Sequence, residues 1–351
     1  MGLEKHERAR TFVKVLLIVV IIAQVVISCF AKPWKNGPVP LDGTFIQLTS
    51  VHLAWKVEQW RELFLYFREM ELKHLIVQWI VYDGISFFDN PFGLSPLEII
   101  LGLADAEGMT VSVGLAMDTA YWQKIGGDPD EVNAYLDDAF VLSRQTAIQV
   151  NEMAGRHPSF QGWYIPQEVD NVHWMKAQRR RILSRYLRDL CSSLRSISPD
   201  KSVSVSGFAN SEVNPEALER FWTKLLTETK VDTVLFQDGI GAGNIGGDET
   251  PAFLGPVLKA AKAAGCEFHV IIEVFQQIAG LPINDDYFQA VPASWQRVHR
   301  QLEIGASGVD SLIAFSVPEY MTPIGGEKAE NLYRSYLQFI HEQGKMLRLL
   351  N

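Results

Sequence analysis

Short apolar runs rich in β-branched and aromatic residues alternate with amphipathic stretches along most of the chain. The runs are nearly continuous in apolar residues, which is typical of strands buried on both faces. Eight such runs lie at residues 43–49, 74–81, 109–116, 160–165, 201–208, 232–238, 267–275 and 310–317. Because helical patterns separate the runs, the strands are predicted to be parallel. Parallel strands of this number close into a barrel, so the predicted fold class is α/β, a single (β/α)8 TIM barrel over residues 43–345.

The stretches between the runs carry helix signals. Apolar residues recur at helical spacing in residues 55–72, 96–108, 179–197, 214–228, 250–265, 295–308 and 327–343. Gly108 stands where a helix C-cap is expected, and Asn214 followed by Pro215 is a typical helix start. An open doubly wound sheet is the alternative fold, but it usually has a glycine-rich turn after its first strand, and residues 50–55 contain no glycine. A GxGxxG match at residues 241–246 follows the sixth strand, so it indicates dinucleotide binding only weakly.

The first 31 residues differ in kind from the rest of the chain. A basic stretch over residues 1–14 precedes an uncharged apolar stretch over residues 15–28, which is the pattern of a secretory signal peptide. Residues 26–29 (VISC) are a loose match to a lipobox, in which Cys29 would be lipidated after cleavage. Residues 15–31 are also long enough to span a bilayer as an uncleaved anchor. We therefore predict a signal peptide, lipoprotein signal or membrane anchor over residues 1–31, then a linker over residues 32–42. The location is predicted to be periplasmic or cell-envelope, with membrane tethering.

Composition and motifs exclude several classes of function. The formal net charge of −9 argues against a nucleic-acid partner, because such affinity comes mainly from Lys and Arg meeting phosphates. The three cysteines form no CxxC pair, and the first strand lacks an HxH motif. The sequence also lacks the GxSxG motif of a serine nucleophile. We therefore predict no metal and no cofactor.

Polar and aromatic residues gather where the predicted strands end, which is where (β/α)8 barrels carry their function. Glu168 follows the fourth strand and Glu273 ends the seventh, and a closed barrel brings these two ends together. Glycoside hydrolysis needs two carboxyl groups flanking the bond, so these residues are the predicted catalytic pair. Glu168 is the predicted acid/base and Glu273 the predicted nucleophile. The predicted substrate-binding residues are Gln47, Gln78, Trp79, Asp118, Trp122, Tyr164, Asp170, His173, Asn210, Gln237, Asp238, Phe275 and Glu319.

The sequence resembles the domain-of-unknown-function 4434 family over roughly residues 43–345. The resemblance rests on the opening GTFIQ strand, on IVQW at 76–79 and, most specifically, on GWYIPQEVDN at 162–171. It implies a glycoside-hydrolase-like barrel that handles sugars, without naming a substrate. Many barrel glycosidases carry Asn directly before the acid/base Glu, whereas this chain has Gln167. Two functions therefore stay open: an exported hydrolase acting on a polysaccharide or oligosaccharide, or a non-catalytic carbohydrate-binding lipoprotein of an exopolysaccharide or envelope system.

Overall fold

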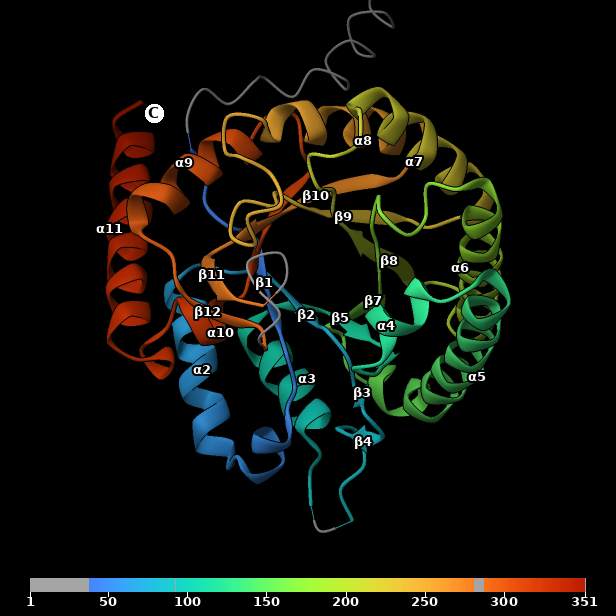
Figure 1. Cartoon of the computed structure of the whole chain (residues 1–351). Helices are drawn as coiled ribbons and strands as arrows, with labels where there is room; N and C mark the ends of the chain where they lie inside the picture. Colours follow the sequence, from blue (N-terminus) through green and yellow to red (C-terminus); the bar gives the residue numbers. More distant parts are fainter. Residues whose placement is uncertain (1–37, 92, 281–286, 351) are drawn as a thin grey trace, which may run out of the picture. The chain divides into compact units, whose positions relative to one another are not determined.

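The computed structural model of the protein describes residues 38–91, 93–280 and 287–350. Eight parallel strands form a closed barrel in the order β1-β13-β10-β9-β8-β7-β5-β2 (Figure 1). They are β1 (Gly43–Ile46), β2 (His74–Val77), β5 (Thr110–Gly114), β7 (Phe160–Val169), β8 (Ser202–Gly207), β9 (Thr233–Gln237), β10 (Glu267–Glu273) and β13 (Ser311–Phe315). Each strand lies within or overlaps one predicted run, in the predicted order. The prediction of a TIM barrel is therefore confirmed.

Helices surround the barrel (Figure 1). They are α2 (Val57–Glu69), α3 (Pro96–Glu107), α5 (Pro129–Ala154), α6 (Ala177–Ile197), α7 (Pro215–Thr229), α8 (Thr250–Ala264), α9 (Trp295–Gly305) and α11 (Glu327–Leu350). Gly108 is the C-cap of α3 with φ +66°, and Asn214 caps α7 by accepting a hydrogen bond from Glu216 N, as predicted. The pattern gave no prediction of α5, because only seven of its 26 residues are buried and its apolar stripe is thin.

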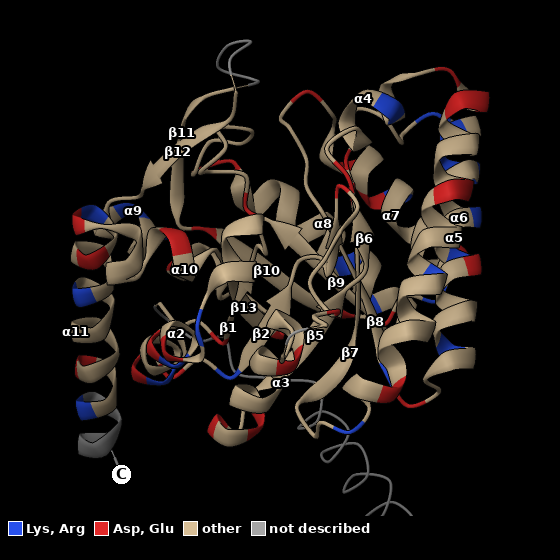
Figure 2. Ribbon diagram, turned by 90° about the horizontal axis from the view of Figure 1, so that it is seen from below, with Lys and Arg blue, Asp and Glu red and all other residues tan. Residues whose placement is uncertain are grey.

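Short elements follow several barrel strands and build up the carboxyl-terminal rim. One small sheet holds β3 (Val81–Tyr82), β4 (Ile85–Ser86) and β6 (Ala116–Met117), and β11 (Phe275–Ala279) pairs with β12 (Gln289–Pro292). The short helices there include α4 (Tyr121–Gly126) and α10 (Val317–Tyr320). The side view places β11, β12 and α4 at the same end of the barrel (Figure 2). This end is the predicted functional face.

Strand alternation divides the core into two parts. The barrel interior contains a buried apolar layer made by Phe45, Ile76, Tyr164, Leu235, Ile271 and Ile313. The alternate residues of the same strands pack outward against the helices in a much larger cluster. A residue two positions beyond an interior residue therefore points toward the barrel axis. This rule directs Gln78, Gln237 and Glu273 inward.

The fourth barrel strand differs from its prediction in one respect. The predicted run ends at residue 165, but β7 continues through Pro166 to Val169. What changes at Pro166 is the pairing with β8, whose register shifts between Ile165 and Val169. Proline has no N–H to donate to a neighbouring strand, so a ladder breaks there more easily than elsewhere. Glu168 consequently lies inside an irregular strand end, not beyond it.

Residues 1–37 lie outside the described part of the chain, and with them Cys29 and the predicted signal or anchor. Among the helices that the structure describes, none is long and apolar enough to cross a membrane. Cys191 and Cys266 are both buried free thiols.

Gly114 marks a close approach between β5 and β2. A Cβ at this position would lie 2.2 Å from Gln78 O and 2.3 Å from Val77 O. Because backbone atoms cannot yield as a side chain can, Gly114→Ala is expected to lower the free energy of unfolding by about 1–3 kcal/mol, as overpacking does. Urea denaturation measures this change. Gly102→Ala is the matched control, since Gly102 is exposed in α3 with nothing near its missing Cβ; unchanged stability in both variants would contradict the prediction.

Candidate active site

Glu168 is held in place from three sides at the carboxyl end of β7. Gln237 donates from its Nε2 to Glu168 Oε1 at 3.1 Å, and Ser206 also hydrogen-bonds the carboxyl group. The Tyr121 hydroxyl donates to the backbone carbonyl of Glu168 at 2.5 Å. Gln237 and Ser206 are side chains of β9 and β8, so neighbouring strands orient the carboxyl group within the barrel.

The surroundings of Glu168 suit a group that exchanges protons. Burial, the largest effect, raises the pKa of Glu168 to about 7 against the opposing hydrogen bond from Gln237. The negative charge of Asp170 raises this pKa further. A carboxyl group with a pKa near the working pH can donate a proton in one step and accept one in the next.

Glu273 is almost fully buried at the end of β10. Its Oε2 accepts a hydrogen bond from Ala242 N at 2.8 Å, in the loop after β9. Its Oε1 is buried and has no partner among the described residues. The loop thus fixes one carboxyl oxygen, and the described part of the chain supplies no donor to the other. Burial raises the pKa of Glu273, and the neighbouring Asp238 carboxylate raises it further.

Behind Glu273, several buried polar side chains form a hydrogen-bonded network that joins β9, β10 and α9. Gln301 of α9 donates from Nε2 both to Asp238 Oδ2 at 2.6 Å and to Glu273 O at 3.1 Å. Arg297, one turn earlier on α9, donates to the backbone carbonyl of Phe275 and lowers the pKa of both Asp238 and Glu273 by its charge. Burial still raises the pKa of Asp238 overall. The protonation of Glu273 is therefore coupled to Asp238.

Glu168 and Glu273 stand three strand positions apart in the ring of eight, with β8 and β9 between them. Both lie at the carboxyl ends of their strands. Gln237, on β9, faces the same space and is bonded to Glu168. The structure thus gathers the two predicted catalytic carboxyl groups at one end of the barrel.

Two predicted sugar-contacting aromatic residues are buried instead. Tyr164 belongs to the interior apolar layer and is 0% exposed, with its hydroxyl 2.7 Å from Ser206 Oγ. Trp79 is 7% exposed, donates from Nε1 to Leu48 O at 2.7 Å and stacks on Tyr82. Neither residue offers a ring face to solvent. These two aromatic side chains are buried because their bulk fills the barrel wall.

Other aromatic candidates lie on the rim. Trp122 of α4 is 41% exposed, and its ring lies beside Phe208 and His173 at centroid distances of 5.7 and 6.3 Å. Phe275 is 5% exposed and packs against Phe315 and Tyr320. Of these, Trp122 offers the ring surface that stacking on a sugar requires.

Three acidic candidates accept hydrogen bonds from other groups of the protein. Asp170 is buried and accepts hydrogen bonds from Val172 N, His173 N and the His173 ring, so it shapes the loop after β7. Asp118 accepts from Tyr135 Oη at 3.1 Å and from Ala120 N. Asp238 points outward to Gln301, behind the barrel wall, and not toward the axis. Asp170 and Asp238 thus accept hydrogen bonds from other groups of the protein, which argues against the predicted contact with substrate.

The remaining candidates are polar and lie at strand ends. Gln78 is buried, and its Oε1 has no partner among the described residues. Gln47 is half-buried just beyond β1. Asn210 exchanges backbone hydrogen bonds with the Asn171 side chain. Glu319 accepts from Ser316 Oγ, and burial raises its pKa.

Sequence reasoning missed Ser206, Tyr121, Arg297 and Gln301. Ser206 could have been found, because it lies two residues beyond Ser204 in the alternating run SVSVSG. The other three come from helices, where no strand-end rule applies. Within the described ranges, no group of three His, Cys, Asp or Glu side chains is arranged to hold a metal ion.

The chain is similar to known proteins in sequence and in structure. It is 24% identical over 198 residues to "Uncharacterized protein YbcH" of Escherichia coli (strain K12). The matched residues make up 56% of this chain and 64% of that protein. A proposed α-L-fucosidase of Bacteroides thetaiotaomicron has a similar structure, with a TM-score of 0.71 and 21% identity over 88% of this chain and 95% of that one.

The β-galactosidase of Marinomonas ef1 is more distant, with a TM-score of 0.55 and 11% identity over 87% of this chain and 60% of that one. At these identities the likeness shows a shared barrel fold. The family described as Domain of unknown function (DUF4434) matches residues 41–325, and the chain belongs to this family.

Proposed function

We propose that the protein is an exported glycoside hydrolase that acts on a polysaccharide or oligosaccharide with retention of configuration. The observation that carries the proposal is the environment of Glu168: a half-buried carboxyl group with a pKa of about 7, oriented by Gln237 and Ser206, three strands from Glu273. Two carboxyl groups are the equipment that the reaction needs. The barrel fold shared with glycosidases agrees with this function.

The proposed reaction has two steps. Glu168 gives its proton to the glycosidic oxygen while Glu273 Oε1 attacks the anomeric carbon, so the leaving group departs as an alcohol. Glu168, now ionised, then takes a proton from water as the water oxygen attacks the anomeric carbon, and the bond between this carbon and Glu273 breaks to free the Glu273 carboxylate. Gln237 keeps the Glu168 carboxyl oriented in both steps, and Ala242 N holds the other oxygen of Glu273.

Release of reducing ends from a panel of bacterial and plant polysaccharides tests the proposal. Hydrolysis of a panel member that is lost in both Glu168→Gln and Glu273→Gln would support it. Binding of a polysaccharide without hydrolysis would instead favour the non-catalytic function. One residue favours that alternative: Gln167 points away from the site, since it donates to Ala116 O at 2.8 Å and accepts from Tyr186 Oη at 2.7 Å.

Asp238 is expected to set the pH at which Glu273 ionises. Asp238 raises the pKa of Glu273, and only ionised Glu273 can attack, so first-turnover rates should increase as pH rises through that pKa. Asp238→Asn removes the repelling charge and should move this increase to lower pH. The measurement is the first-turnover release of an activated leaving group in the Glu168→Gln background, where no acid is needed and residue 168 no longer titrates.

The control for this experiment is Asp248→Asn, which changes an exposed carboxylate paired with Arg300. It should leave the pH dependence unchanged. An identical pH midpoint with and without the Asp238→Asn change would show that the buried charge does not act on the nucleophile.

Export is a separate proposal, and Cys29 is its most specific residue. If residues 26–29 act as a lipobox, radiolabelled palmitate should appear on the protein and disappear in Cys29→Ala. Unlabelled protein of full length in the membrane fraction would favour the uncleaved anchor. A shorter, unlabelled protein outside the membrane fraction would show a cleaved signal peptide.

A further inference from the structure

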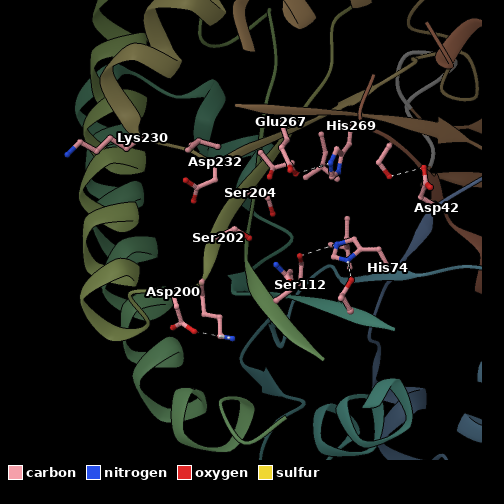
Figure 3. A pocket seen from close by; sticks show the side chains of 18 of the residues that line it. Asp42, His74, Ser112, Asp200, Ser202, Ser204, Lys230, Asp232, Glu267 and His269 are labelled. Carbon is pink, nitrogen blue, oxygen red and sulfur yellow. Dashed lines mark hydrogen bonds and ion pairs between the residues drawn. The ribbon is translucent and has the colours of Figure 1, made fainter. Parts of the chain in front are cut away.

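A large cavity opens at the amino-terminal end of the barrel, opposite the candidate active site. Its volume is about 870 Å³, and side chains near the starts of the strands line it (Figure 3). Ile76 and Leu235, which belong to the interior apolar layer, also line it. On β9 and β10 this layer lies between the cavity and Gln237 or Glu273 in residue order. The cavity is therefore separate from the candidate active site.

The cavity exists because short polar residues occupy inward positions near the strand starts. Barrel interiors are normally filled there by bulky branched side chains. In β8 the run SVSVSG instead turns Ser202 and Ser204 inward, while its valines are buried in the outer core. Ser112, Thr233 and Ser311 occupy the corresponding places on β5, β9 and β13. Side chains this small leave the space above the apolar layer unfilled.

The lining offers many hydrogen-bonding groups. His74 is held by Thr110 Oγ1 at 2.7 Å and Ser112 Oγ at 3.2 Å, and burial lowers its pKa to about 4, so its ring is neutral. His269 contacts Glu267 through Nε2 at 3.3 Å, whereas its Nδ1 is buried and has no partner among the described residues. Ser204 Oγ donates to Trp163 O and Ser311 Oγ donates to Asp42 Oδ2, both at 3.1 Å, so the remaining lone pairs of these hydroxyls serve as acceptors. The cavity thus presents closely spaced donors and acceptors.

The fixed charges of the lining cancel. Four basic side chains (Lys73, Arg195, Lys201 and Lys230) face four acidic ones (Asp42, Asp200, Asp232 and Glu267). Several of them pair with each other, as Arg195 does with Asp232 at 2.8 Å and Lys201 with Asp200 at 3.6 Å. An anion such as phosphate needs an excess of positive donors, which this wall lacks. An apolar ligand would leave the buried Nδ1 of His269 without a partner.

We propose that this cavity is a second binding site, for a small neutral polyhydroxylated molecule such as a monosaccharide or a polyol. The adjacent hydroxyls of such a molecule are donors and acceptors at once, which matches the lining. The cavity volume lies within the range of small-molecule sites. The proposal does not depend on the catalytic role of Glu168 or Glu273.

Imidazole NMR signals of the full chain, labelled with 15N-histidine, test the proposal. Titration with D-glucose, D-galactose, D-xylose and glycerol should shift the His74 and His269 signals in a saturable manner for at least one of these probes. Inorganic phosphate should not shift them. His74→Gln and His269→Gln assign the two signals, because each variant removes one of them.

Two variants locate the binding. Ser204→Val fills the cavity and removes a hydroxyl, and Ser202→Ala removes a half-buried hydroxyl at low risk to folding. Each should weaken binding by roughly three- to tenfold, the scale of one lost hydrogen bond. Gln237→Ala, at the other end of the barrel, should leave binding unchanged. The proposal is overturned if no neutral probe shifts the signals, if phosphate alone does, if both serine variants bind normally, or if Gln237→Ala abolishes binding.

Discussion

Glu168→Gln is expected to lower the rate of hydrolysis of an unactivated glycoside by at least about a hundredfold, the scale of lost general acid–base catalysis. The amide keeps the size of the side chain but has no proton to give to the glycosidic oxygen. The loss should be smaller in the first turnover of a substrate with a good leaving group, which departs without a proton. The measurement compares kcat/KM for the two kinds of substrate in the wild type and the variant.

The pH dependence gives an independent check on the same residue. Because the pKa of Glu168 is raised to about 7, its protonated form decreases as pH rises through 7, and hydrolysis of the unactivated glycoside should decrease with it. In Glu168→Gln this decrease should disappear. Glu212→Gln is a suitable control, since Glu212 is exposed in the loop after β8. If Glu168→Gln hydrolyses the unactivated glycoside at a near wild-type rate, another residue must be the acid, and Glu319 is the next candidate.

The position of the proposed catalytic pair could be predicted because strand ends are visible in the sequence. Continuous apolar runs show where each strand lies, and a parallel barrel puts all the carboxyl ends on one face. Glu168 and Glu273 follow directly from that rule. Helix α5 could not be predicted from the sequence, because a long helix with a thin apolar stripe resembles a polar connection.

The direction of each side chain was harder to predict than its position along the chain. Neighbouring residues of a strand face opposite sides, so Gln237 and Asp238 cannot both reach the barrel axis. In the structure, Gln237 points into the barrel and bonds Glu168, whereas Asp238 points outward and accepts a hydrogen bond from Gln301 of α9. The same rule separates Gln78 from Trp79. A register error of one residue exchanges the two faces, which is why sequence alone left both members of each pair as candidates.

The contribution of α9 could not be read from the sequence at all. Gln301 and Arg297 reach the site from a helix and lie 28 and 24 positions after Glu273 in the chain. Their contacts depend on how α9 packs against β10, since Gln301 bonds the Glu273 carbonyl and Arg297 the Phe275 carbonyl. Tertiary packing of this kind leaves no local pattern, so the coupling between Asp238 and Glu273 appears only in the folded protein.

Glu273→Gly is expected to abolish turnover of glycosides and to regain part of it when azide is added. The variant lacks the carboxylate that attacks the anomeric carbon, and the space left beside Ala242 N can admit a small anion. Azide would then attack in place of the carboxylate, from the same side, and release a glycosyl azide of inverted configuration. Product analysis by NMR distinguishes this compound from the retained product of the wild type. Glu168→Gly should give the retained azide instead, since there azide acts on the glycosyl–enzyme formed by Glu273. If azide restores neither variant while a confirmed substrate still binds, Glu273 is not the nucleophile, and water attacking across a wider gap becomes the mechanism to test.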